Sequence, residues 1–308
     1  MGNHNPGSTI TMPSKFQGVL AALITPLTDD GSKIDEARLK THIDNLFNAG
    51  IHGIVPGGST GEFTTLTTAE RKQLAELSLK YTAGRGSVMI GVGSTKTDEA
   101  IELAVHAAQI GVDAVMVVPP YYDPLSYEQL QEFLLEIHQA SKLPIVYYNI
   151  PSISGLTLSP EQIAGLSEVG VESFKDTSGN APDFTELVFG HGDKISAMNG
   201  WDTLTFYGMA AGNEAIIWGA ANFIPELAVE MWNAIVVNND IRKGREIWAR
   251  AWPICKFLEA HNYSSGVRAG VELRGQKTGG YRKPVAPLKQ QYIAELQQLL
   301  RNAQVKSV

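Results

Sequence analysis

Eight short apolar segments recur along the first 220 residues of the chain, and stretches with helical periodicity separate them. The apolar segments cover residues 18–24, 53–56, 88–92, 114–118, 145–148, 171–175, 195–198 and 215–218. Between them, apolar residues recur at helical spacing over residues 35–48, 68–82, 98–109, 127–140, 160–166 and 182–189. The pattern predicts eight strands that alternate with helices.

Strands and helices that alternate in this way form either an open, doubly wound sheet or a closed barrel. An open sheet of this kind usually has about five or six strands. The count of eight therefore favours an α/β fold of the (β/α)8 type, a TIM barrel, which we predict over residues 15–222.

The chain continues for about 85 residues after the last predicted strand. Helical periodicity over residues 225–238, 242–260 and 288–301 predicts an appended C-terminal helical region over residues 223–308. Residues 279–287 are rich in glycine and proline, so we predict that they form a loop on the surface. We predict that residues 1–14 form a flexible N-terminal arm.

Composition and charge narrow the classes of protein that this chain can represent. The absence of an apolar run of about 20 residues, and of an apolar core near the polar start, predicts no membrane span and a cytoplasmic location. The single cysteine, Cys255, excludes an intrachain disulfide and a multi-cysteine metal site. The net charge is −7 and the basic residues are scattered, so we expect a small-molecule partner and no nucleic acid.

Polar residues that can bind a substrate or take part in catalysis lie at the carboxyl ends of the predicted strands. TIM barrels have their active sites at this face. The second strand leads into Gly57-Gly-Ser59-Thr60-Gly-Glu62, in which hydroxyls and free amides can hold a carboxylate. The alternative is a plain glycine-rich turn, and no Gly-Lys-Ser/Thr follows to make a phosphate loop.

Lys175 ends the sixth predicted strand and is the strongest single indication of chemistry. Burial inside a barrel disfavours the ammonium form, so that free amine remains to attack a carbonyl. The alternative is an ion pair with Asp176, but the alternation of a strand places these two side chains on opposite faces.

Three other residues at strand ends each have a structural alternative. Tyr148 follows the fifth strand and can shuttle a proton, or it can be a core residue. Tyr122 belongs to a tyrosine pair beside prolines, which is more typical of packing or an interface. Asp202 can bind a hydroxylated substrate or cap the next helix.

The sequence indicates no metal and no organic cofactor. Its seven histidines do not gather, and we expect most of them, including His261, to lie in helices or away from the strand ends. No dinucleotide-binding glycine pattern follows the first strand.

The motifs at residues 57–62, 148–155 and 174–179, together with the spacing of Tyr148 and Lys175, resemble those of a known family. The chain is similar to the dihydrodipicolinate synthase and N-acetylneuraminate lyase family of class I, Schiff-base-forming aldolases, from about Phe16 to the loop at 279–287. The resemblance implies that Lys175 forms a Schiff base with a 2-keto acid and that Tyr148 shuttles protons.

The same resemblance implies roles for the remaining candidate residues. Ser59 and Tyr122 would extend the proton shuttle, with Tyr122 reaching into a neighbouring subunit of a homotetramer or homodimer. Thr60 would hold the substrate carboxylate. The other predicted substrate-binding residues are Gly200, Ile217, Asp202, Thr177 and Ile153.

The leading hypothesis is a lyase or aldolase that cleaves or condenses a 2-keto acid, with pyruvate as product or substrate. A dehydratase or deaminase of a 2-keto-3-deoxy acid or cyclic imine can use the same lysine. A 4-hydroxy-tetrahydrodipicolinate synthase is argued against by Ile153, where the synthase branch usually has an arginine, and Thr203 in place of a carboxylate argues against sialic acid. A non-catalytic barrel that binds a keto acid is the hypothesis from a different class.

Overall fold

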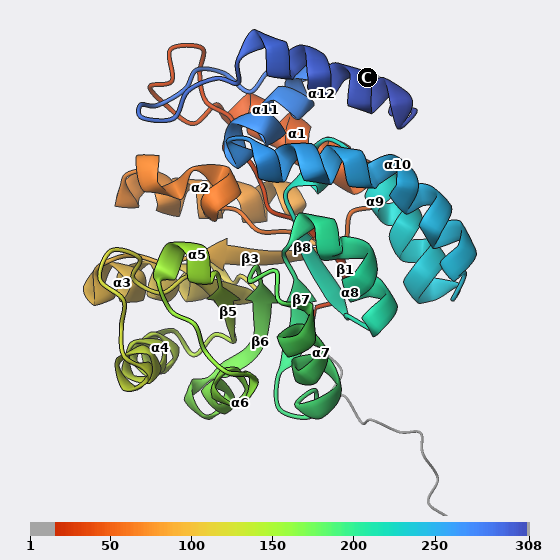
Figure 1. Ribbon diagram of the computed structural model, residues 1–308. Helices are drawn as coiled ribbons and strands as arrows, with labels where there is room; N and C mark the ends of the chain where they lie inside the picture. The colour runs from red at the N-terminus through yellow and green to blue at the C-terminus, as the bar shows by residue number, and fades with distance from the viewer. Residues whose placement is uncertain (1–15, 307–308) are drawn as a thin grey trace, which may run out of the picture.

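Eight parallel strands close into a barrel in the computed structural model, which describes residues 16–306 (Figure 1). Each strand pairs with the next one in sequence, and the eighth pairs with the first. The strands are β1 (Gly18–Ala21), β2 (Gly53–Ile54), β3 (Ser87–Gly91), β4 (Ala114–Val117), β5 (Ile145–Asn149), β6 (Val171–Asp176), β7 (Ser196–Asn199) and β8 (Ala215–Trp218). The predicted TIM barrel is confirmed, whereas the predicted N-terminal arm, residues 1–14, lies outside the described residues.

Helices surround the strands, and most of them begin and end within a few residues of the predicted ranges. They are α1 (Glu36–Asn48), α2 (Thr68–Thr82), α3 (Thr97–Ile110), α4 (Tyr127–Ser141), α5 (Pro151–Ser154), α6 (Pro160–Gly165), α7 (Ala181–Gly190) and α8 (Thr205–Ala211). Short turns of 3-10 helix occur at η1 (Ser59–Gly61), η2 (Phe63–Thr65), η3 (Leu166–Val169), η4 (Asp202–Leu204) and η5 (Ala220–Asn222). The sequence pattern did not predict α5 and α8, which are only four and seven residues long.

The barrel wall separates two apolar cores, because alternate residues of each strand face opposite sides. Tyr147 belongs to the outer core, between the strands and the helices, and Tyr148 belongs to the inner one. The inner core also contains Leu20, Val55, Met89, Met116, Val146, Met198 and Ile217. A polar residue at an inward position near the end of a strand is therefore held by a packed wall.

The C-terminal region is a group of helices at one side of the barrel, α9 (Pro225–Trp232), η6 (Asn233–Val237), α10 (Ile241–Ala260), α11 (Tyr263–Leu273) and α12 (Gln290–Asn302) (Figure 1). The three predicted helical runs correspond to α9 with the π-helical η6, to α10 and to α12. α9 contacts β1 as well as α10, so it also covers the barrel wall. No helix among residues 16–306 is long and apolar enough to cross a membrane.

The prediction of three helices in this region was wrong in omitting α11. Gly266 and Gly270 lie within it, and glycine disfavours helices by about 1 kcal/mol per residue relative to alanine. Gly270 is needed for close packing, since a Cβ there would lie 2.6 Å from the ring of Phe223. α11 contacts η1, and α10 contacts η4, so both helices reach the ends of the strands.

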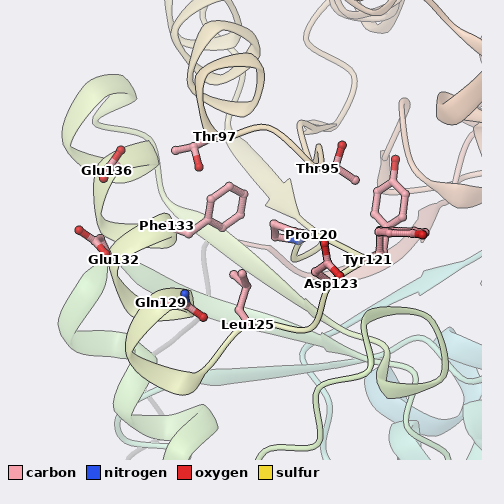
Figure 2. Close-up of a pocket in the computed structure, with 11 residues that line it drawn as sticks. Thr95, Thr97, Pro120, Tyr121, Asp123, Leu125, Gln129, Glu132, Phe133 and Glu136 are labelled. Atoms are coloured by element: carbon pink, nitrogen blue, oxygen red, sulfur yellow. The ribbon is translucent and has the colours of Figure 1, made fainter.

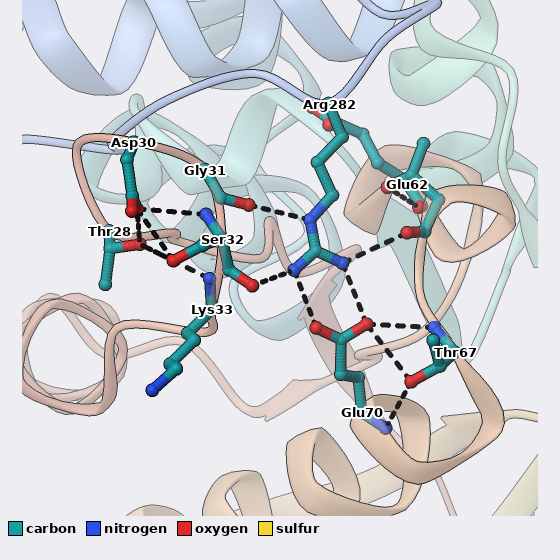
Figure 3. Close-up of polar contacts among 10 residues, drawn as sticks. Thr28, Asp30, Gly31, Ser32, Lys33, Glu62, Thr67, Glu70 and Arg282 are labelled. Atoms are coloured by element: carbon teal, nitrogen blue, oxygen red, sulfur yellow. Dashed lines mark hydrogen bonds and ion pairs between the residues drawn. The ribbon is translucent and has the colours of Figure 1, made fainter.

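The loop at residues 279–287 lies against the segment that follows β1, as Figure 3 shows. Arg282 donates to the carbonyl oxygens of Gly31 and Ser32 and binds both carboxylate oxygens of Glu70. Glu70 also caps α2 through a reciprocal pair of hydrogen bonds with Thr67. One guanidinium group therefore ties the C-terminal loop to the start of α2 and to the chain after β1.

Candidate active site

Lys175 and Tyr148 lie next to each other inside the barrel. β5 and β6 pair in the register that sets these two residues opposite each other. Lys175 Nζ lies 4.2 Å from the centroid of the Tyr148 ring, and the lysine side chain is buried. An amine and a phenol are thus fixed together on two rigid strands.

Asp176 lies on the other side of the barrel wall, as the alternation of the strand predicts. Its carboxylate accepts hydrogen bonds from Asn149 Nδ2 at 2.7 Å and from Ser178 Oγ at 2.9 Å. Burial raises the pKa of this carboxyl. The alternative interpretation of Lys175, an ion pair with Asp176, does not describe the structure.

The turn after β2 brings Ser59 and Thr60 to the barrel mouth. Gly57 has a φ of +74°, and a Cβ there would lie 3.0 Å from the carbonyl oxygen of Gly91, so the position requires glycine. Thr60 is buried, whereas Ser59 is exposed. Glu62 ends η1 in a left-handed conformation with a φ of 55°.

α11 holds this turn from the outside. Arg268 Nη1 binds the Glu62 carboxylate at 3.2 Å, and both side chains are buried. Ser264 Oγ donates to the carbonyl oxygen of Ser59 at 3.0 Å. The plain-turn interpretation is therefore incomplete, because a distant helix fixes the conformation of the turn.

Gly200, at the end of β7, leaves the space that Lys175 and Thr177 fill. A Cβ at Gly200 would lie 2.5 Å from Lys175 Cε and 2.7 Å from Thr177 Oγ1. The Thr177 hydroxyl is buried, and it has no hydrogen-bond partner among the described residues. A buried hydroxyl without a partner is costly, so this group is available to a bound substrate.

Asp202 is buried below the barrel mouth and does not cap a helix. Its oxygens accept hydrogen bonds from Trp218 Nε1 at 3.0 Å and from the Tyr263 hydroxyl at 2.7 Å. Burial raises the pKa of Asp202 to about 7, while these two hydrogen bonds and Lys175 act in the opposite direction. The interpretation of Asp202 as a helix cap is wrong, since η4 has no side-chain cap.

One cavity of about 790 Å³ brings most of the predicted residues together at the carboxyl ends of the strands. It is large enough for a substrate of metabolite size. The predicted residues that line it are Lys175, Tyr148, Ser59, Thr60, Gly200, Ile217, Asp202, Thr177 and Ile153.

Tyr122 is the predicted residue that does not line this cavity. Its side chain is 85% exposed, and it borders a separate hollow of about 670 Å³ between the end of β4 and α4. Figure 2 shows this hollow, where Phe133 and Leu125 lie among polar side chains such as Thr97 and Glu132. The neighbouring Tyr121 lines both hollows, so Tyr122 stands just outside the site within a single chain.

The C-terminal region contributes five residues to the cavity that the sequence analysis missed. They are Leu258, Glu259, His261, Tyr263 and Ser264. The expectation that the histidines avoid the strand ends was wrong for His261, because the end of α10 carries it to the cavity. No local motif marks these positions, since the tertiary packing of α10 and α11 brings them there.

Among the described residues that line this cavity, no group of side chains is arranged to hold a metal ion. Among the described residues, one group of side chains could hold a metal ion, Glu161, Glu186 and His191, and none of them lines the cavity. Both carboxylates of this group are exposed. The amine, the hydroxyls and the buried carboxyl are the groups that the cavity offers for chemistry.

Comparison with known proteins assigns this arrangement to a family. The model of the dihydrodipicolinate synthetase family matches residues 15–303. A curated relative from Methanopyrus kandleri, named 4-hydroxy-tetrahydrodipicolinate synthase, is 36% identical over 89% of this chain and 92% of its own length. A relative of the same name from Methanothrix thermoacetophila is 34% identical over 92% of this chain and 96% of its own length.

Solved structures agree with this assignment. The dihydrodipicolinate synthase of Acinetobacter baumannii, crystallised with pyruvate, superposes with a TM-score of 0.89 at 28% identity, over 94% of this chain and 99% of its own. YagE of E. coli K12, a family member also solved in complex with pyruvate, gives a TM-score of 0.89 at 26% identity, over 95% and 100% of the two chains. The chain therefore belongs to the dihydrodipicolinate synthetase family and is a lyase of that family.

Proposed function

We propose that this enzyme forms a Schiff base between Lys175 and a 2-keto acid such as pyruvate, and makes or breaks a carbon–carbon bond beside the imine. The observation that carries the proposal is the buried Lys175 amine, 4.2 Å from the ring of Tyr148, in a cavity of about 790 Å³. Two solved relatives in complex with pyruvate support the choice of keto acid.

In the condensing direction, the Lys175 amine adds to the keto carbon, and loss of water leaves a protonated imine. The imine draws electrons from the neighbouring carbon, which gives up a proton to form an enamine. The enamine carbon then attacks an aldehyde carbon, and the aldehyde oxygen takes a proton. Hydrolysis of the imine releases the product and restores the amine, and cleavage is the reverse sequence.

The other residues of the site suit supporting roles in this sequence. The Tyr148 hydroxyl would carry the protons that carbinolamine formation and imine hydrolysis require. Thr60, on the turn that α11 fixes, and the buried Thr177 hydroxyl would hold the carboxylate of the keto acid. These groups all act from rigid strands or fixed turns, which favours preorganisation.

Borohydride reduction in the presence of pyruvate tests the proposal, because it converts a transient imine into a stable secondary amine. We expect an added mass on the intact protein and a modified peptide that contains Lys175. The Lys175→Ala variant should give no adduct and lose activity by at least about 10³-fold while remaining folded. An adduct elsewhere, or full activity in this variant, would contradict the assignment of the lysine.

A second candidate is 4-hydroxy-tetrahydrodipicolinate synthase itself, because the curated relatives carry that name and favour it over a lyase of other substrates. Ile153 weakens this candidate, since it lines the outer cavity with 54% of its side chain exposed. Within the described residues, no arginine lines the cavity to receive the carboxylate of aspartate semialdehyde.

Turnover of pyruvate with aspartate semialdehyde separates the two candidates. A kcat/KM above about 10⁴ M⁻¹s⁻¹, in the usual range for an enzyme with its own substrate, would establish the synthase. We expect a far lower kcat/KM for aspartate semialdehyde. The Ile153→Arg variant should raise this kcat/KM, because the arginine supplies a cation for the carboxylate of the aldehyde. Analysis for released pyruvate also distinguishes cleavage of longer keto acids from loss of water or ammonia.

A further inference from the structure

Glu259 is a carboxylate in the lining of the cavity, and the proposed chemistry at Lys175 does not use it. It lies in the last turn of α10 and lines the cavity with an exposed side chain. Its position depends on packing between two distant parts of the chain, because its partner Thr203 is 56 residues away in sequence.

Hydrogen bonds hold this carboxylate in one orientation. Glu259 Oε1 accepts from the backbone N–H of Thr203 at 2.8 Å, and Oε2 accepts from the Thr203 hydroxyl at 3.0 Å. The same hydroxyl accepts from Trp201 Nε1 at 3.0 Å, and Trp201 also lines the cavity. A carboxylate has about four lone-pair sites, so two bonds leave it able to accept more.

The charge around Glu259 restricts what can bind beside it. Among the described residues that line the cavity, the charged side chains are Lys175, Asp202 and Glu259, together with His261 when protonated. Lys175 would be occupied by the imine, and the keto acid brings its own carboxylate. A partner with a second carboxylate would meet Glu259 with no arginine to offset the repulsion.

Apolar and hydroxyl-bearing groups make up the rest of the outer wall. Ile153, Trp201 and Leu258 offer apolar surface, and Ser264 and Tyr263 offer hydroxyls. Asp202 is less available to a partner, because both of its oxygens already accept hydrogen bonds from protein groups. The outer cavity thus suits a short carbon chain with hydroxyl donors.

We propose that Glu259 is the residue that selects the partner aldehyde, and that this partner is an uncharged, hydroxylated aldehyde whose hydroxyl groups donate to the Glu259 carboxylate. The inference rests on the proposed Schiff-base function and names the substrate class of that site. In the cleavage direction, the substrate would be a 2-keto acid with a hydroxylated, uncharged tail.

The test compares three aldehydes of similar size with pyruvate as the common partner. These are D-glyceraldehyde, which is neutral and hydroxylated, succinic semialdehyde, which is anionic, and butanal, which is apolar. We expect the wild-type kcat/KM for glyceraldehyde to exceed that for succinic semialdehyde at least about tenfold. Glu259→Gln should lower the value for glyceraldehyde about tenfold, since hydrogen bonds to charged groups are the stronger ones.

Opposite changes in kcat/KM for glyceraldehyde and succinic semialdehyde would show that Glu259 selects the aldehyde and does not only stabilise the local structure. In Glu259→Gln, the value for succinic semialdehyde should rise about threefold or more, because a repulsive charge has gone. Loss of structure at Thr203 would instead lower the values for all three aldehydes together. Glu246→Gln removes the same charge from an exposed position of α10 and should leave all three values unchanged.

Trapping with pyruvate alone keeps this test independent of the proposed function. An adduct on Lys175 in both wild type and Glu259→Gln would show that the imine chemistry is intact. With that adduct present, two results in wild type would overturn the inference about Glu259: no activity with glyceraldehyde, or a kcat/KM for succinic semialdehyde that equals or exceeds that for glyceraldehyde. A change in the same direction for both aldehydes in Glu259→Gln would also overturn it. Absence of the adduct in wild type would refute the proposed function instead.

Discussion

Tyr148 and Lys175 occupy paired positions on β5 and β6, and the amine lies 4.2 Å from the centroid of the phenol ring. Parallel pairing fixes the distance between their backbones, and the packed inner core limits the movement of their side chains. The Tyr148 ring packs against the Lys175 amine, whereas the hydroxyl is the group that we propose to carry protons. A substitution that removes the hydroxyl and keeps the ring therefore tests the proton transfer alone.

Tyr148→Phe removes the hydroxyl and retains the ring beside Lys175. We expect kcat to fall about 10²- to 10⁴-fold, the usual contribution of a positioned proton donor, while the protein melts close to the wild-type temperature. Borohydride should still trap pyruvate on Lys175 after long incubation. Steady-state kinetics with single-turnover trapping checks this, and an unchanged kcat would exclude Tyr148 as the proton shuttle.

Arg268 and Glu62 form a buried ion pair that holds the turn after β2. Arg268→Met leaves the Glu62 carboxylate buried without its partner, so we expect the free energy of unfolding to fall by about 3–5 kcal/mol. Denaturant unfolding measures this loss, and trapping with pyruvate should become slower because the turn carries Thr60.

A second variant distinguishes the pair from simple loss of packing. Glu62→Gln combined with Arg268→Met removes both charges, and the double variant should lose less stability than the sum of the two single variants. Additive losses would mean that the two side chains do not stabilise each other and that the guanidinium acts only through its other contacts, such as the carbonyl oxygens of Gly279 and Gly280.

Asp202 should make stability depend on pH in a definite direction. Burial raises the pKa of its carboxyl from 3.8 to about 7 in the folded protein. Between these two values the folded protein keeps a proton that the unfolded chain has released, so this group contributes stability that is lost as the pH rises towards 7. Linkage gives a loss of about 2–3 kcal/mol between pH 5 and pH 8.

Asp202→Asn cannot ionise, so the variant should lack this part of the pH dependence. Denaturant unfolding at pH 5 and pH 8 gives the change in the free energy of unfolding between the two pH values. This change is less affected than the free energy itself by the lost hydrogen bond with Trp218 or Tyr263. Asp193→Asn, at an exposed position before β7, is the control and should parallel wild type. Parallel curves for Asp202→Asn would contradict a raised pKa.

The barrel and the strand-end part of the candidate site could be predicted from local pattern for a physical reason. Strand alternation decides which side of the wall a residue faces, so Lys175 and Asp176 could be assigned to opposite sides without a structure. Strand ends meet at one face of a TIM barrel, which brought Ser59, Tyr148 and Lys175 into the same prediction, whereas Gly200 was predicted from the family resemblance.

The part of the outer cavity that the C-terminal helices contribute could not be predicted, because long-range packing builds it. Tyr263 meets Asp202 across 61 residues of sequence, and Ser264 meets Ser59 across 205. The glycines and serines of α11 gave a weak helical signal, although tight packing against Phe223 explains Gly270. The residues that we propose to select the partner aldehyde therefore lie in the part of the fold that local periodicity describes least well.

Tyr122 tests whether the site is completed by a second copy of the chain. Its side chain is 85% exposed beside a hollow next to the Lys175 cavity, which suits a residue that acts in a neighbouring subunit. We expect light scattering to give two or four times the chain mass of 33.4 kDa, and Tyr122→Ala to lower kcat at least about tenfold.

Mixing two variants, one impaired at Tyr122 and one lacking Lys175, identifies the subunit in which Tyr122 acts. Tyr122→Ala and Lys175→Ala subunits, dissociated and reassembled together, should recover activity, because a mixed pair contains one site with an intact lysine and a tyrosine from its partner. Random pairing should give roughly a quarter of the wild-type activity per subunit, since half of the pairs are mixed and each has one complete site. If Tyr122 served its own subunit, no mixed pair would contain a complete site, and the mixture would show only the residual activity of the Tyr122→Ala subunits. A monomer in solution would also remove the proposed role.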